Sequence, residues 1–334
     1  MTRNEVAEKL AAKMRESKIN LIETPIDQNR SSNWSKSISC EKGKELETLC
    51  NVFGLTQNEV LENLFDAATS GDGNEKSRIL TLHSSSLLTF LHFSCIKMHP
   101  ITILGTEYVD VMFEVKNDVI NNHGNPSNMD ILLLDKSQRK LLFLESKFTE
   151  YISGGRAYFS NPKKYGEFYD TLCLDKNRFD FEASEIDVRH RPNKEKPEGY
   201  VSKEYCLHND KRPASYLGGI KQAFSHLIGI ATGPSAIQTD ANKDYTKQTL
   251  EKAKEITFAS IVFNCNPQKF DAYSKLYEST FDKKNATVIK EAIRTVVPES
   301  KIVDKLIIHN SLFTYQKIFN GFELPEKIRT FYTL

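Results

Sequence analysis

The chain has 334 residues, of which 39% are hydrophobic and 27% are charged, with a formal net charge of +1. This composition supports a substantial core, and no apolar run approaches the length of a membrane span. We therefore expect a globular, cytoplasmic protein with no membrane association. Because positive and negative charges nearly balance, the chain as a whole has no strong electrostatic field that would attract nucleic acid. Any DNA-binding site must therefore be a local patch of positive charge.

Several cofactor classes lack their sequence signatures. The six cysteines include no C-x-x-C pair, and Cys206-x-His208 is followed by no matching second pair, which argues against structural zinc. The glycine-rich nucleotide-binding motifs are absent, and so is the H-E-x-x-H motif of zinc peptidases. We expect no nucleotide cofactor.

The first part of the chain has helical periodicity and helix-capping patterns. The expected helices are an opening helix with the capping box Thr2-x-x-Glu5, a helix from Glu41 to Phe53 that stops at Gly54, and a helix that starts at the capping box Thr56-x-x-Glu59. We therefore treat residues 1–74 as an N-terminal helical region packed on the core, and residues 75–334 as the main domain.

The pattern then changes from helix to strand. A helix is expected from Leu82 to Ile96, followed by strands at Tyr108–Val115, Met129–Leu134 and Lys140–Lys147. The last two are joined by the polar turn 135–139, so they form a hairpin. Their unbroken apolar runs are typical of central strands covered on both faces.

Residues 151–216 lose this regularity, and we interpret them as an insertion after the third core strand. The elements expected after it are a helix at 217–230, a strand at 256–264, a helix that begins at Asn266-Pro267, a helix at 286–296 and a strand at 302–309. The fold class is α/β (α+β), with a mixed central β-sheet flanked by helices.

The tripeptide Glu-Ser-Lys occurs three times, at Glu16, Glu145 and Glu299. Only the middle copy ends a strand that is expected to be buried. There Glu145 and Lys147 are two residues apart, so both side chains leave the same face of the sheet. Unpaired buried charge is costly, which favours a functional role for this pair.

Asp130 stands at the start of the preceding strand. The short turn makes the two strands antiparallel, so Asp130 and Glu145 should be neighbours. Two carboxylates that close repel each other unless a cation lies between them, and oxygen ligands favour Mg²⁺ or Mn²⁺. Lys147 can hold the nucleophilic water and offset charge that develops on a phosphate. The alternative is that Asp130 ends a strand and that Glu145 and Lys147 form a salt bridge at the sheet edge.

Asp130, the 14 residues that separate it from Glu145, and Glu145-x-Lys147 resemble the PD-(D/E)xK nuclease superfamily over about residues 75–264. The segments 127–130 and 143–148 are also similar to a group of bacterial restriction-endonuclease-like proteins. The chain departs from the superfamily pattern at Met129, where the family has proline. The resemblance implies a restriction-endonuclease-like core in which Asp130, Glu145 and the Ser146 backbone carbonyl bind the metal.

The family often adds a helical glutamate to the site. Glu75 is our choice, because it lies just before the helix that leads into the first strand. The alternatives are the helix residues Glu47, Glu59 and Glu62, and Glu114 on the first strand.

The family also often carries Gln-x-x-x-Tyr on the helix after the third strand, with the Gln near the metal-bound water or the phosphate. Gln222 to His226 resembles this motif, with His in place of Tyr, so we assign Gln222 to the catalytic set and Lys221 and His226 to substrate binding. The alternative is an ordinary polar stripe on a helix. In the insertion, Arg156 and Lys163 are expected to contact substrate, because basic and aromatic residues alternate there; a solvated lid is the alternative.

We therefore expect a metal-dependent nuclease that hydrolyses DNA phosphodiester bonds, of a restriction type, with DNA as its partner and a homodimer left open. A repair nuclease or an RNA nuclease of the same superfamily is one alternative. The other is a non-catalytic protein that keeps the nuclease fold and binds nucleic acid or a partner.

Overall fold

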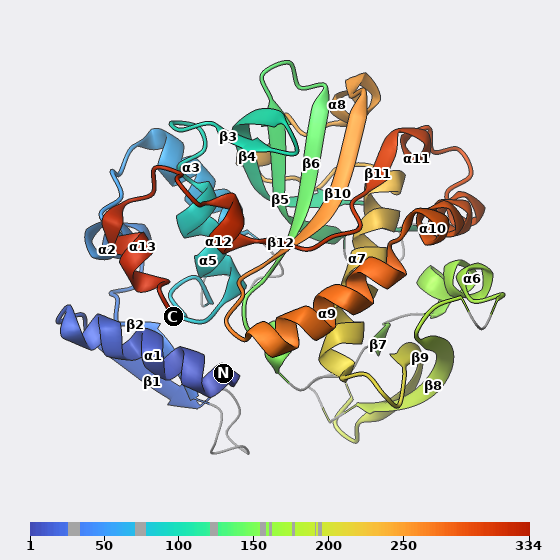
Figure 1. Ribbon diagram of the computed structural model, residues 1–334, viewed down its shortest axis with the longest axis horizontal. Helices are drawn as coiled ribbons and strands as arrows, with labels where there is room; N and C mark the ends of the chain where they lie inside the picture. The colour runs from blue at the N-terminus through green and yellow to red at the C-terminus, as the bar shows by residue number, and fades with distance from the viewer. Residues whose placement is uncertain are drawn as a thin grey trace.

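A mixed β-sheet runs through the middle of the molecule and carries helices on both faces (Figure 1). The computed structural model describes residues 1–25, 34–70, 78–120, 126–153, 158–159, 162–175, 178–190, 192 and 196–334. Six strands lie in the order β11-β10-β6-β5-β4-β3, and β12 also pairs with β10. The expected class, a mixed sheet flanked by helices, is confirmed.

The elements before the sheet are α1 (Arg3–Glu16), β1 (Leu21–Pro25), β2 (Trp34–Ile38), α2 (Glu45–Phe53), α3 (Glu59–Ala68) and α5 (Ser85–Phe93). The sheet is built from β3 (Ile101–Ile103), β4 (Thr106–Asn117), β5 (Ser127–Asp135), β6 (Lys140–Lys147), β10 (Glu255–Val262), β11 (Leu306–Ile308) and β12 (Phe313–Thr314).

Between β6 and β10 lie η2 (Glu150–Ile152), β7 (Tyr158–Phe159), α6 (Pro162–Leu172), β8 (Glu182–His190), β9 (Tyr200–His208), α7 (Ala214–Thr232), η3 (Asp240–Asn242) and α8 (Lys247–Lys252). The remaining helices are α9 (Pro267–Thr280), α10 (Lys283–Val296), α11 (Ile302–Lys305), α12 (Tyr315–Ile318) and α13 (Glu326–Phe331).

The hairpin of β5 and β6 forms the centre of the sheet, as the apolar runs predicted. Its antiparallel register pairs Ile131 with Leu144 and Leu134 with Leu141. The Asp135 carboxylate holds the turn by accepting hydrogen bonds from the following backbone N–H groups. Strand β10 then runs parallel to β6, and α7 lies in the crossover between them. Both hairpin strands therefore have a strand on each side.

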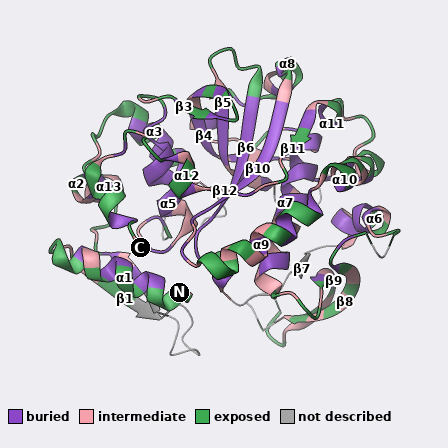
Figure 2. Ribbon diagram, viewed as in Figure 1, coloured by how far each residue is buried: buried purple, intermediate pink, exposed green. Residues whose placement is uncertain are grey.

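The two faces of the sheet are covered by different helices. On one face, Phe90 of α5 contacts Phe113 of β4. On the other face, α7 lies close to the strands, because a Cβ on Gly229 would meet Ser127 at 3.0 Å and Asn117 at 3.1 Å. The strands and the inner sides of α5 and α7 are buried (Figure 2). A side chain on the inner surface of α7 is thus pressed against the ends of the central strands.

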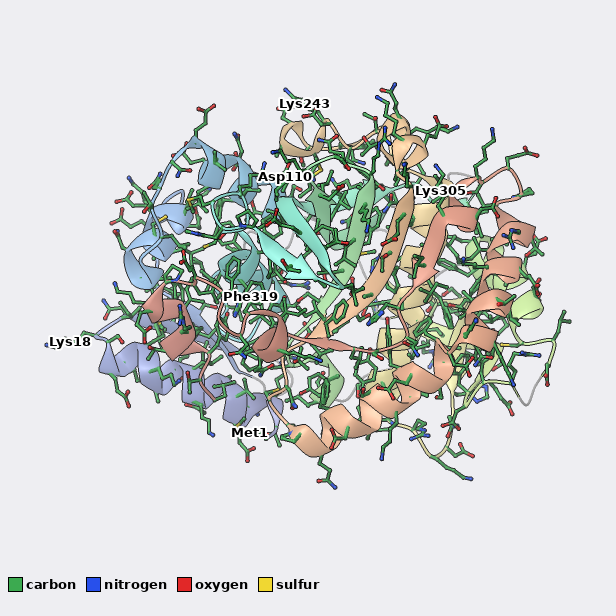
Figure 3. All side chains as sticks on the ribbon, turned by 45° about the horizontal axis from the view of Figure 1, so that its top comes forward. Met1, Lys18, Asp110, Lys243, Lys305 and Phe319 are labelled. Carbon is green, nitrogen blue, oxygen red and sulfur yellow. The ribbon has the colours of Figure 1, made fainter. Side chains whose placement is uncertain are left out.

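Charged side chains such as Lys18, Lys243 and Lys305 extend from the rim of the molecule, whereas side chains fill the space between sheet and helices (Figure 3). Within the part of the chain that the structure describes, no helix has both the length and the apolar character needed to cross a membrane.

Some predicted boundaries are wrong. Asn58, not Thr56, caps α3, since its side chain accepts a hydrogen bond from the Leu61 N–H at 2.9 Å. The run 302–309 is the short helix α11 followed by β11, because a brief apolar run does not distinguish helix from strand. The helix expected at 82–96 is shorter, since Ser84 caps α5.

The region 1–74 contains more than helices, and the segment 151–216 is more regular than expected. Strands β1 and β2 form a hairpin that the sequence did not predict. In 151–216, α6 packs beside a three-stranded sheet of order β7-β9-β8. The long pair β8 and β9 carries polar residues on both faces, so it lacks the alternation that identifies a half-buried strand.

His92 on α5 gives a pH prediction for stability. Its ring is fully buried among aromatic rings, and burial lowers its pKa to about 4, although the Leu88 carbonyl, 2.8 Å from Nδ1, opposes this shift. The unfolded chain therefore binds a proton at His92 below about pH 6.5 and the folded chain only below about pH 4. Stability should rise with pH across this window, by at most about 3 kcal/mol from this residue.

Urea unfolding between pH 4 and 7 measures this effect. The variant His92→Leu should have a flatter dependence of unfolding free energy on pH than the unmodified chain. An unchanged slope would show that His92 is not responsible.

Candidate active site

Two carboxylates, Asp130 and Glu145, meet the ammonium group of Lys147 at one end of the central hairpin. Extension of the observed register by one pair places Asp130 opposite Glu145. The Ser146 N–H donates to Asp130 Oδ2 at 2.7 Å, which ties the two strand ends together. The Lys147 ammonium forms an ion pair with Glu145 Oε1. Glu145 and Lys147 are only 3% and 6% exposed, whereas Asp130 is partly exposed.

Burial and mutual charge set the protonation of these groups. Burial disfavours both charged forms, but the Lys147 ammonium holds the pKa of Glu145 well below its usual range, and the Glu145 carboxylate raises the pKa of Lys147. Burial, and then the negative charge of Glu145, raise the pKa of Asp130 well above its ordinary value. Lys147 therefore stays cationic, and a further positive charge beside Asp130 would favour its ionised form.

His226 of α7 faces the same carboxylate. Its Nε2 lies 2.8 Å from Glu145 Oε2, and its Nδ1 lies 2.9 Å from the Ser127 hydroxyl. The ring is only 6% exposed. His226 thus lies under the helix and against the sheet, rather than on an outer face that substrate could reach directly.

Lys147 and Gln222 line one cavity of about 140 Å³, together with Glu150, Tyr151 and Tyr273. The cavity lies between η2, the first turns of α7, and α9. It has room for a few water molecules or one phosphoryl group. The structure therefore brings Gln222 to the same small space as Lys147.

Two further lysines are linked electrostatically to Lys147, one directly and the other through the first. Burial lowers the pKa of Lys221, and the charge of Lys147 lowers it further. Burial lowers the pKa of Lys164 on α6 to about 8, with Lys221 as the second cause. Lys221 is thus within electrostatic reach of both Lys147 and Lys164, and we call these three residues the lysine cluster.

The opposite face of β6 is held by Tyr315 of α12. Its hydroxyl lies 2.7 Å from Ser146 Oγ and 3.1 Å from Thr89 Oγ1 of α5. The ring is 1% exposed. This link holds the strand between Glu145 and Lys147 from the opposite face of the sheet. Nothing in the sequence indicated it.

Two other carboxylates lie close to the site. Glu150 accepts a hydrogen bond from the Phe148 N–H at 2.6 Å, and its charge acts on both Asp130 and Lys147. Glu150 was not predicted from the sequence, although its position three residues after Lys147 was a usable signal. Glu114, one of the alternatives, stands across from Asp130 in register, with a φ of 50°. A non-glycine residue in this region stores strain, which often accompanies a functional site.

Three of the alternative glutamates lie on the surface of the helical region, and the side chains of three other predicted residues fall outside what the structure describes. Glu47, Glu59 and Glu62 are exposed on α2 and α3, and Glu47 pairs with Lys44 at 2.8 Å. Glu75 and Arg156 lie outside the described residues. Lys163 lies in α6, and the structure does not describe its side chain.

The donor set at the hairpin end suits a hard divalent cation. Glu145 Oε2 is buried and lies 2.8 Å from His226 Nε2. In a strand, the C=O of a residue points to the same side as its N–H, so the Ser146 carbonyl is directed toward Asp130. No group of three His, Cys, Asp or Glu side chains already converges as a metal site among the residues described. Asp130, Glu145 and the Ser146 carbonyl are the groups that would hold a metal there.

No protein-family model, curated protein or solved structure matches this chain.

Proposed function

We propose that this protein is a metal-dependent nuclease of the PD-(D/E)xK type that hydrolyses DNA phosphodiester bonds. The observation that carries the proposal is the meeting of Asp130, Glu145 and Lys147 at one end of a buried hairpin. Buried charges of this kind are costly unless they are paired or functional, and these three are the groups that metal-assisted phosphodiester hydrolysis requires.

The order of the elements supports this proposal. Helix α5 precedes the antiparallel strands β4, β5 and β6, as expected of a restriction-endonuclease-like core. Helix α7 then follows, and β10 returns parallel to β6. The acidic residues stand at the end of this central pair, where α7 also delivers Gln222.

Each group has a separate task in the proposed reaction. Asp130 and Glu145 hold Mg²⁺ or Mn²⁺, which when bound polarises the phosphoryl oxygen and lowers the pKa of water. Lys147 cannot act as a base because its pKa is raised, so it orients the attacking water and offsets negative charge on the phosphate. Gln222 can donate to that water or to the phosphate from the other wall of the cavity.

The lysine cluster supplies the local positive patch that a nearly neutral chain needs. Lys221 interacts electrostatically with Lys147, which lines the cavity, and with Lys164. Such a group attracts phosphates by charge, independently of base sequence. We therefore expect DNA affinity to fall steeply as salt concentration rises.

One observation favours a non-catalytic role instead. Glu145 is 3% exposed and already touches both Lys147 and His226, as a purely structural ion pair would. That alternative predicts neither metal binding nor cleavage.

The direct test is to incubate the purified chain with supercoiled plasmid, single-stranded DNA and RNA, with Mg²⁺, with Mn²⁺, or with a chelator. We expect metal-dependent cleavage of duplex DNA. Cleavage of RNA or of single strands alone would redirect the proposal within the superfamily. Absence of cleavage with every metal would favour the non-catalytic alternative.

A further inference from the structure

Tyr273 of α9 belongs to the wall of the cavity that Lys147 and Gln222 also line. The side chain is buried, with 1% of the residue exposed, and its hydroxyl makes no hydrogen bond to any described residue. Burial raises the pKa of Tyr273, so the hydroxyl keeps its proton and remains a donor. A buried hydroxyl without a partner is costly, so its presence beside a cavity requires an explanation.

Packing fixes the place of this hydroxyl, because α9 lies against both η2 and α7 (Figure 1). The Tyr273 ring is stacked on Tyr151 of η2 and lies 5.4 Å from the ring of Tyr216 in α7, measured between centroids. A Cβ on Gly219 would collide with the hydroxyl, which therefore lies directly against the first turns of α7. Gln222 follows Gly219 by three residues, a spacing that places both on one side of the helix. The hydroxyl thus lies on the side of α7 that carries Gln222.

Two other donors in this cavity also have capacity for a ligand. The Gln222 amide makes no hydrogen bond to any described residue. The Lys147 ammonium is paired with Glu145, which leaves N–H groups for a further acceptor. Donors from β6, α7 and α9 therefore surround a space of about 140 Å³, which has room for one phosphoryl group.

Glu150 is the one carboxylate among the described residues that line the cavity. Its Oε2 accepts the Phe148 N–H at 2.6 Å, and its charge interacts with that of Lys147. The lining is thus rich in donors but not strongly positive, so free phosphate should bind weakly, with a dissociation constant on the order of millimolar. Inorganic phosphate keeps a proton near neutral pH, and it can donate this proton to Glu150 while it accepts from the other groups.

We infer that this cavity is a phosphoryl-binding pocket in which the Tyr273 hydroxyl is the third donor, beside Lys147 and Gln222. Gly219 provides the space that the hydroxyl needs. The inference rests on the proposed function only for the source of the phosphoryl group, which is then the DNA backbone. Tyr273 lies outside residues 75–264, over which the chain resembles the nuclease superfamily, so that resemblance does not imply this role.

Titration of the metal-free full chain with inorganic phosphate tests this inference. With ¹³C at the Cζ atom of every tyrosine, the NMR shift of each signal reports hydrogen bonding by its hydroxyl. We expect phosphate to shift the Tyr273 signal, identified as the one that Tyr273→Phe lacks. The phosphate dissociation constant of this variant should rise about fivefold, the effect of one hydrogen bond. Phenylalanine keeps the ring that packs against Tyr151 and Tyr216, so the variant should fold.

Tyr277→Phe is the matched control, because Tyr277 is buried one turn later on the same helix and does not line the cavity. It should leave the phosphate affinity and the shift of the Tyr273 signal unchanged. Lys147→Ala should weaken phosphate binding more than Tyr273→Phe does, since hydrogen bonds from a charged donor are stronger.

Three results would overturn the inference: phosphate that binds without shifting the Tyr273 signal, an equal phosphate affinity in Tyr273→Phe, and no phosphate binding. A Tyr273 signal that responds to phosphate in a chain that cleaves no nucleic acid would instead sink the nuclease proposal and leave the pocket standing. Metal-dependent cleavage by a chain whose Tyr273 signal ignores phosphate would do the reverse.

Discussion

Replacing Asp130 with asparagine should lower metal-dependent cleavage by on the order of a thousandfold, while the free energy of unfolding stays the same or increases. Cleavage should fall without a loss of stability because burial and the charge of Glu145 already disfavour the ionised form of Asp130 in the folded chain. Asparagine keeps an oxygen that can accept the Ser146 N–H and removes the repulsion between the carboxylates. Cleavage rates with Mg²⁺ and Mn²⁺, together with urea unfolding, measure both quantities.

Two lysine variants test whether the position of Lys147, and not merely the loss of a lysine, matters for cleavage. Lys147→Ala should also abolish cleavage, whereas Lys301→Ala, in the copy Glu299-Ser300-Lys301, should not, because Lys301 is exposed.

If Asp130→Asn retains cleavage within tenfold of the unmodified chain, the role of Asp130 as a metal ligand is refuted. A large loss of stability in that variant would show instead that Asp130 is a structural residue.

The largest expected effect on stability comes from Gly219 in α7. A Cβ at this position would lie 2.1 Å from the Tyr273 hydroxyl and 2.9 Å from its ring. Tyr273 is 1% exposed and packs against Tyr151 and Tyr216, so it cannot move aside cheaply. Gly219→Ala should therefore cost about 1–3 kcal/mol, and it should also narrow the cavity that Gly219 and Tyr273 line.

Gly218, the preceding residue, is the matched control. No described atom lies within 4 Å of a Cβ placed there. Gly218→Ala should stabilise the chain by about 0.5–1 kcal/mol, since alanine favours helix more than glycine does. Thermal unfolding of the two single variants, one residue apart, compares close packing with helix propensity directly. Equal changes in both variants would contradict the close contact at Gly219.

The hairpin could be predicted because its signals are local. Two apolar runs around the turn 135–139 define both the strands and the register, and this register places Asp130 beside Glu145. The same locality explains why α9 and α10 were expected near their observed positions, since Asn266 caps α9 by accepting a hydrogen bond from the Lys269 N–H.

Other parts of the site depend on packing between distant segments. The side of α7 that faces the sheet follows from the close approach at Gly229, so the sequence did not reveal that His226 would meet Glu145. Tyr315 reaches Ser146 from 169 residues away. The left-handed backbone at Glu114 is equally invisible to residue patterns, because it depends on the strand into which that residue is built.

The segment 151–216 also begins and ends at the candidate site. Residues of η2 and of the start of α7 both line the cavity, and the Ser215 hydroxyl donates to the Tyr151 carbonyl at 3.3 Å. Strands β7, β8 and β9 lie in the chain between η2 and α7, the two segments that line the cavity. The hydrogen bond between Ser215 and Tyr151 therefore joins the two ends of the segment that carries these three strands, and both ends line the cavity.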